Sequence, residues 1–168
     1  MQGKQLVAIV ANNKFDKGTI RSIANELRKM HLVTSNMRND LPKVEFADKI
    51  ERKSLLNFDL TKHNIFVNEN RVGFIDFDDA KYGDSICDIA IVIFLIFISK
   101  KNEFNVEGAK YFLDEYYSEN EKIRLLEEKL IKSYAIEWVN YIINNNEFES
   151  SLKESFEFKR KIWENSWK

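Results

Sequence analysis

Two carboxylates and one amide in the middle of the sequence are the groups best suited to chemistry. They are Asp59, Asn64 and Asp76, and a hairpin pattern lies between the last two. The hairpin is predicted from the apolar residues at 65–67 and 72–75, with a turn at 68–70. Because a hairpin brings its two ends together, we expect Asn64 and Asp76 to face one site. Mg²⁺ takes oxygen ligands and keeps several waters, so one carboxylate, one amide and the phosphates of a ligand suffice to hold it.

Three blocks of sequence surround these residues. The chain reads N-F-D-L-T-K-H-N-I-F-V from residue 57, F-I-D-F from residue 74 and G-D-S-I-C-D-I-A from residue 83. They resemble the aminoglycoside phosphotransferase and choline kinase family, which commonly reads H-G-D-L-x-x-x-N-I, then V-I-D-F, then G-D-x-x-x-D-L-A. One block alone is a weak signal, whereas three in order at the right separations form a strong one.

The resemblance implies a role for each polar residue of the blocks. Asp59 is the catalytic base that accepts the proton of an attacking hydroxyl, and Asn64 and Asp76 bind Mg²⁺. Asp84 is expected to hold the backbone of the catalytic loop by hydrogen bonds, and Asp88 to start a buried helix. The implied reaction transfers the γ-phosphate of ATP to an alcohol. Aminoglycosides and choline are cationic, so a small-molecule acceptor with positive charge and an acidic acceptor cleft are expected.

Two departures from the family pattern stand just before the base. Asn57 replaces the usual His, and Phe58 replaces a small residue. The family's His helps to hold the loop, and Asn57 is able to form hydrogen bonds in its place.

Several nearby residues have two interpretations each. Asp78 and Asp79 either help to bind a second Mg²⁺ or form a solvated acidic turn. Lys62 either reaches a phosphate or faces solvent, and the second is favoured. His31 is either a ligand or a half-buried histidine at a helix end, and the second is again favoured, since a lone His is a poor metal signal.

Aromatic and acidic residues of the helical regions are also open to two interpretations. The tryptophans either stack on a substrate or belong to the core, and the core is favoured; they are Trp138, Trp163 and Trp167. A group of acids either attracts a cationic substrate or forms an exposed helix turn, with equal weight; they are Asp114, Glu115, Glu119 and Glu121.

The composition is that of an ordinary globular chain. It has 168 residues, 44% hydrophobic and 32% charged, with a formal net charge of -1. This charge gives no reason to expect nucleic acid or an anionic membrane as a partner. The apolar run 89–98 is shorter than the ~20 residues of a membrane span, so a buried helix is predicted there. The single Cys87 suits a reducing cytoplasm, and the abundance of Lys, Asn, Ile and Glu hints at a bacterium of low GC content.

The remaining pattern predicts a mainly helical fold with one small hairpin. A helix with Thr19 as its N-cap is expected through about Leu32, and four more are expected over 85–99, 106–117, 119–143 and 148–167. This order resembles the C-terminal lobe of a kinase-like fold. We therefore expect one domain over 1–168, with a hinge remnant at 1–14, the catalytic loop, hairpin and metal motif at 55–90, and a helical substrate-side subdomain at 91–168.

The nucleotide lobe of such kinases is not found in the sequence. That lobe carries a phosphate-covering loop and a strand Lys that holds the α- and β-phosphates. We expect the chain to be truncated and inactive alone, with a separate N-terminal lobe or self-association completing it. Whether it is an enzyme is left open, and the alternative is a non-catalytic helical binding or interaction module with a vestigial kinase site.

Overall fold

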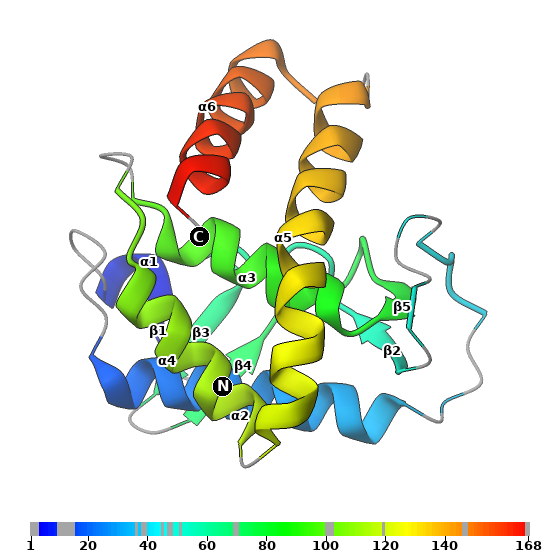
Figure 1. Cartoon of the computed structure of the whole chain (residues 1–168), viewed down its shortest axis with the longest axis vertical. Coiled ribbons are helices and arrows are strands. Elements are labelled where there is room, and N and C mark those ends of the chain that lie inside the picture. The colour runs from blue at the N-terminus through cyan, green and yellow to red at the C-terminus, as the bar shows by residue number, and fades with distance from the viewer. Residues whose placement is uncertain are drawn as a thin grey trace.

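The computed structural model describes residues 4–9, 16–35, 37, 40–44, 46, 49–50, 52–68, 71–99, 103–118, 120–145 and 148–166. Helices dominate these ranges, and two small antiparallel sheets accompany them. The expected fold class, mainly α with a small β-hairpin, is confirmed. Figure 1 shows the long helix α5 (Glu121–Asn144) running along most of the molecule, with α6 (Ser150–Ser166) folded back beside its second half.

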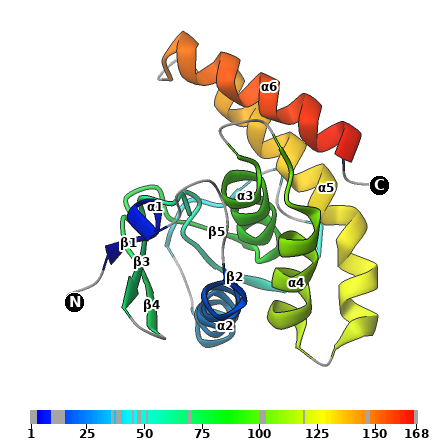
Figure 2. The same cartoon turned by 90° about the vertical axis from the view of Figure 1, so that its left-hand side faces the viewer.

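Helix α3 (Ile86–Phe97) forms the centre of the core. All twelve of its residues are buried, because apolar side chains occupy every face of the helix. Helix α5 packs against it, and the β1–β3–β4 sheet lies beyond it on the side away from α5 (Figure 2). The predicted buried helix is thus confirmed, and it is the element to which the site is attached.

The predicted hairpin is present and joins a three-stranded sheet. Strands β3 (Ile65–Asn68) and β4 (Arg71–Phe74) pair in antiparallel register, with Ile65 opposite Phe74. The short β1 (Lys4–Gln5), which lies in the expected hinge segment, pairs with β3 and is followed by helix α1 (Leu6–Ile9).

A second sheet was not expected from the sequence. Strand β2 (Lys53–Leu56) pairs with β5 (Lys81–Asp84), so the chain just before the catalytic loop lies against the chain just before α3. Each of these strands has only four residues of mixed polarity, and this is too few for the alternating pattern of a strand to be recognised in the sequence.

Helix α2 (Lys17–Thr34) begins earlier than predicted. Its N-cap is Asp16, whose side chain accepts hydrogen bonds from the backbone N–H and the hydroxyl of Thr19 at 2.9 and 2.7 Å. The prediction of Thr19 as the cap is therefore wrong. Asp has the stronger acceptor, and Thr19 occupies the third helical position, where the donor to be capped lies.

The other predicted helices agree with the structure. They are α4 (Val106–Tyr117), α5 and α6, and Asn145 terminates α5 as the asparagine run suggested. Trp138 and Trp163 are 2% and 0% exposed, which confirms them as core residues, and Trp167 lies outside the described residues. Among the described residues no helix has both the length and the apolar character needed to cross a membrane.

Trp163 anchors α6 and gives a test of the packing. It is the buried residue of that helix and lies against Phe94 and Phe104. We expect Trp163→Ala to lower the free energy of unfolding by about 3–5 kcal/mol, as loss of a buried Trp does. Phe158→Ala, at an exposed position of the same helix, should change it by less than about 0.5 kcal/mol. Urea denaturation of both variants measures this, and equal effects would contradict the assignment.

Candidate active site

A buried carboxylate holds the catalytic loop. Asp88, in the first turn of α3, accepts hydrogen bonds from the backbone N–H groups of Asn57 and Phe58, at 2.8 and 3.0 Å. His31 Nε2 lies 3.4 Å from the same carboxylate. Because Asp88 is fully buried, these donors and the positive end of the α3 dipole are what make an ionised carboxylate tolerable there.

Asp84 has a different task from the one predicted. Its carboxylate accepts hydrogen bonds from the backbone N–H groups of Lys49 and Ile50, the ammonium of Lys53 and the hydroxyl of Tyr134. The expectation that Asp84 holds the catalytic loop is therefore wrong, since Asp88 does so. Asp84 instead fastens the segment that leads into β2.

Asn57 replaces the expected His and forms the hydrogen bonds that the loop needs. Its Nδ2 donates to the carbonyl oxygens of Ile75 and Asp76 at 3.2 and 2.9 Å, and its Oδ1 accepts from the backbone N–H of Asp59 at 3.2 Å. One buried amide thereby connects the loop that carries the expected base to the strand end that carries an expected metal ligand.

Two residues of the site have left-handed backbone conformations. They are Phe58, with φ of 70°, and Asp76, with φ of 59°. Asp adopts this region with some ease, whereas for Phe it costs roughly 1–2 kcal/mol. Strained residues of this kind persist where the surroundings impose them, and they cluster at functional sites.

Asn64 lies against Asp59. Its Nδ2 donates to both the carbonyl oxygen and Oδ2 of Asp59, each at 2.9 Å. The backbone N–H of Ile75 donates to the Asn64 carbonyl at 3.0 Å, which places Asp76 next along the chain. The predicted pairing of the hairpin ends is thus present in the backbone.

The donor set fits a magnesium ion. Since the Asn64 amide nitrogen is turned to Asp59, its Oδ1 is left for a ligand, and no described hydrogen bond occupies the exposed carboxylate of Asp76. Among the described residues no three His, Cys, Asp or Glu side chains form a metal site by themselves. An amide oxygen, one carboxylate and the oxygens of a phosphate ligand match what Mg²⁺ takes.

The electrostatic surroundings of Asp59 suit a proton acceptor. Burial raises the pKa of Asp59 to about 6, and the nearby carboxylates of Asp76 and Asp79 act in the same direction. The hydrogen bond from Asn64 and the proximity of His63 oppose the rise. A base is most effective when its pKa lies near the working pH, so a carboxyl with this pKa is a better base than an ordinary one.

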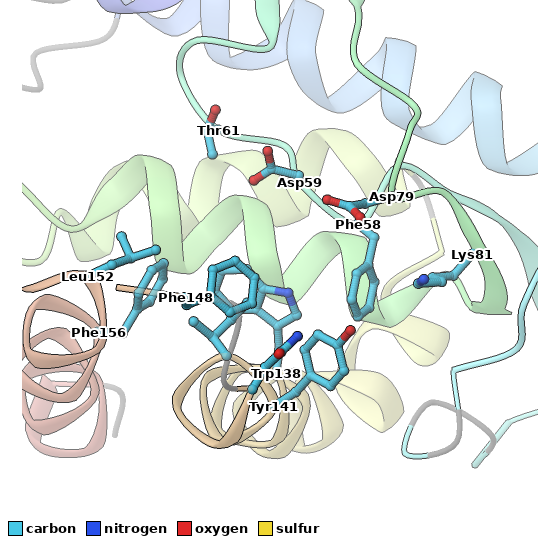
Figure 3. A pocket seen from close by; sticks show the side chains of 12 residues that line it. Phe58, Asp59, Thr61, Asp79, Lys81, Trp138, Tyr141, Phe148, Leu152 and Phe156 are labelled. Carbon is cyan, nitrogen blue, oxygen red and sulfur yellow. The ribbon is translucent and has the colours of Figure 1, made fainter. Parts of the chain in front are cut away.

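A cavity of about 280 Å³ opens beside Asp59, between the catalytic loop, the end of α5 and the start of α6 (Figure 3). Asp59, Asp79 and Thr61 lie along one side of it, and Trp138 and Tyr141 lie across from them. The remaining lining residues are Phe58, Lys81, Ile142, Asn145, Phe148, Leu152 and Phe156. The indole N–H of Trp138 is buried without a hydrogen-bond partner, which is unusual for a buried donor.

Other candidates lie away from this cavity. His31 is buried, not half-buried, and its Nδ1 lies 2.7 Å from the hydroxyl of Tyr116. The acids of α4 do not line the cavity, since Asp114 pairs with Arg124 and Glu115 pairs with Arg21. Exposed Asp78 is not among the lining residues either, Lys62 is half-buried, and Glu119 lies outside the described residues.

Sequence reasoning missed the cavity as a site. Trp138 was assigned to the core in preference to a substrate-binding role, and Tyr141, three residues further along α5, was not singled out. Lys81 lies between the second and third motif blocks and shows no pattern of its own. The one available signal was Phe58, a bulky residue where the family pattern has a small one.

Comparisons with known proteins place the chain in a family. The profile of the phosphotransferase enzyme family matches residues 41–124, half of the chain. The chain therefore belongs to the phosphotransferase enzyme family. The predicted resemblance to aminoglycoside phosphotransferases and choline kinases is confirmed at this level.

Two similar proteins extend the comparison. A Protein LicA homolog of Mycoplasma capricolum subsp. capricolum is 29% identical over 92 residues, which cover 55% of this chain and 36% of that protein. The solved streptomycin–ATP–APH(2″)-IIa ternary complex has a similar fold, with a TM-score of 0.54 and 17% identity over 90% of this chain and 65% of that one. The chain thus spans about a third of the first protein and just under two thirds of the second.

The raised pKa of Asp59 predicts a stability that depends on pH. Its pKa is about 6 in the folded chain against an ordinary value of 3.8 for an aspartate carboxyl, so stability is lost as the pH rises from about 4 to about 6. We expect Asp59→Asn to relieve this loss and to raise the stability at pH 8 by ~1 kcal/mol, after allowance for solvent screening. The gain should vanish at pH 4.

Thermal unfolding at both pH values in a chelating, metal-free buffer measures this effect. Asp78→Asn, at an exposed position beside the site, is the matched control and should give no such gain. A gain of the same size at pH 4 and pH 8 would contradict the assignment.

Proposed function

We propose that this chain provides the catalytic and acceptor-binding half of a phosphotransferase. The reaction moves the γ-phosphate of ATP to the hydroxyl of a compact, positively charged alcohol. The observation that carries the proposal is the position of Asp59, which is held by Asn64 and borders a cavity lined by aromatic side chains. Asp59 is the base, and Asn64 and Asp76 are the metal ligands.

The arrangement assigns a task to each oxygen of the base. Asn64 Nδ2 holds Oδ2 of Asp59, so Oδ1 is left to accept the hydrogen of an acceptor hydroxyl. Asp88 and Asn57 fix the loop around it, which keeps the carboxylate in place without reorganisation during the reaction. Magnesium, when bound with ATP, supplies neutralisation of the phosphate charge.

The cavity favours a choline-like acceptor over an aminoglycoside-like one. Its volume of about 280 Å³ lies below the roughly 300–1,000 Å³ of sites for drug-sized ligands. Aromatic faces attract quaternary ammonium groups, and Tyr141, which is 40% exposed, presents one at this cavity. Asp59 and Asp79 outweigh Lys81, so the lining carries a net negative charge.

We propose that binding of the nucleotide requires residues beyond those that the structure describes. Both relatives extend well beyond the part that this chain matches. Ile75 and Phe77, on either side of Asp76, are 45% and 39% exposed, and we propose that ATP and a nucleotide-binding lobe cover them. In this proposal residues 1–14 form the hinge to that lobe, 55–90 the catalytic part and 91–168 the acceptor side, in one cytoplasmic domain.

Calorimetry with Mg-ATP tests the nucleotide part of the proposal. The isolated chain should bind Mg-ATP only weakly and transfer phosphate at a negligible rate, because alignment of the nucleotide supplies most of the catalysis. Micromolar affinity with turnover that depends on Asp59 would show that the chain alone is sufficient.

A phosphate-transfer assay tests the function itself. With an N-terminal lobe from a phosphotransferase added, choline should be phosphorylated, and Asp59→Asn should reduce the rate by at least 10³-fold, the order expected for loss of a general base. Binding of choline should remain within a few fold, because the Asn side chain still accepts from Asn64. Choline binding without any transfer would instead favour the alternative of a non-catalytic binding module.

A further inference from the structure

We propose that Phe58 sets the size limit of the acceptor and is thus a specificity-determining residue beside the catalytic base. This inference rests on the proposed function, because it assumes that the cavity beside Asp59 receives the acceptor. Phe58 is neither the proposed base nor a proposed metal ligand.

The backbone fixes the direction of the Phe58 side chain. Its N–H donates to Asp88 Oδ1 at 3.0 Å, and the preceding N–H donates to the other oxygen of that carboxylate. These bonds hold Phe58 at φ of 70°, a region that favours glycine. Because the backbone is held in this conformation, it cannot rotate to carry the side chain away from the cavity.

The ring completes a cluster of three aromatic side chains. Its centroid lies 6.2 Å from that of Phe46 and 5.7 Å from that of Tyr141, and the last two rings are 6.3 Å apart. Phe58 is 5% exposed, and Figure 3 shows its ring between Asp79 and Tyr141 at the cavity. The ring therefore forms a fixed wall of the cavity.

A smaller side chain at this position would enlarge the cavity on the side of the base. The ring takes up space next to Asp59 that glycine would leave open, so an acceptor made of several linked rings meets Phe58 before its hydroxyl reaches the carboxylate. A compact alcohol reaches both the base and the aromatic faces.

Binding measurements without nucleotide test the proposal. Choline serves as the compact probe and kanamycin as the bulky one, each titrated into the full chain by calorimetry. The wild-type chain should prefer choline by at least tenfold in Kd. Phe58→Gly should shift the ratio of the two Kd values by at least tenfold toward kanamycin, and Phe58→Leu, which keeps bulk without the ring, should still exclude kanamycin.

Controls separate a change of selectivity from a loss of structure. Circular dichroism verifies folding, and Phe158→Ala, at an exposed site on α6, should leave both Kd values unchanged. If Phe58→Gly fails to fold, Phe58→Asn replaces it, since Asn tolerates the left-handed region. A Kd ratio that stays within twofold in the folded variant would overturn the proposal.

The remaining outcomes distinguish this proposal from the proposed function. Failure of the wild-type chain to bind either probe would overturn both, since the cavity would not be the acceptor site. A shifted ratio together with no phosphate transfer in the complemented assay would support Phe58 as the selector and reject the enzymatic function.

Discussion

The geometry of the site depends on one buried charge, the carboxylate of Asp88. It accepts two consecutive backbone N–H groups of the catalytic loop and lies beside His31 Nε2. Because a carboxylate only accepts hydrogen bonds, His31 Nε2 is the donor in this contact, while its Nδ1 lies 2.7 Å from the hydroxyl of Tyr116. Helix α3 carries this charge into the core, so the loop is attached to the most deeply buried element of the molecule. Loss of the donors would leave an uncompensated charge there, which is among the costliest defects in a protein.

Phe58 shows how packing compensates a strained backbone. Its left-handed conformation costs roughly 1–2 kcal/mol, whereas burying a phenylalanine contributes about 1.5–3 kcal/mol and each aromatic pair about 0.5–1.5 kcal/mol more. The contacts with Phe46 and Tyr141 are therefore sufficient to offset the strain. A small residue would remove the strain and the packing together, so nearly equal stabilities are compatible with very different cavities.

The sequence was sufficient to predict the parts of the fold that have strong periodicity or strong motifs. The helix at α3, the hairpin and the grouping of Asp59 with Asn64 followed from apolar runs and from the spacing of polar residues. The β2–β5 pair was missed because its strands are four residues long and partly polar. The hydrogen bonds to the catalytic loop were assigned to Asp84 instead of Asp88, because hydrogen-bond partners distant in the chain, such as Tyr134, leave no local pattern. The cavity was missed for the same reason, since its walls come from segments that lie far apart in the sequence.

The two walls of the cavity differ in how strongly they are attached to the core. The catalytic loop is attached to the core through Asp88, but Leu152 and Phe156 belong to α6, which Trp163 fastens as its one buried residue. A helix held in this way opens at a lower free energy than the core does. A ligand that touches both walls acts as a cross-link, so its binding raises the free energy of local opening of α6 and slows the exchange of the amide hydrogens of this helix with solvent. The free energy of ligand binding then includes the free energy of packing α6 against the core. A substitution far along α6 therefore weakens binding without touching the ligand.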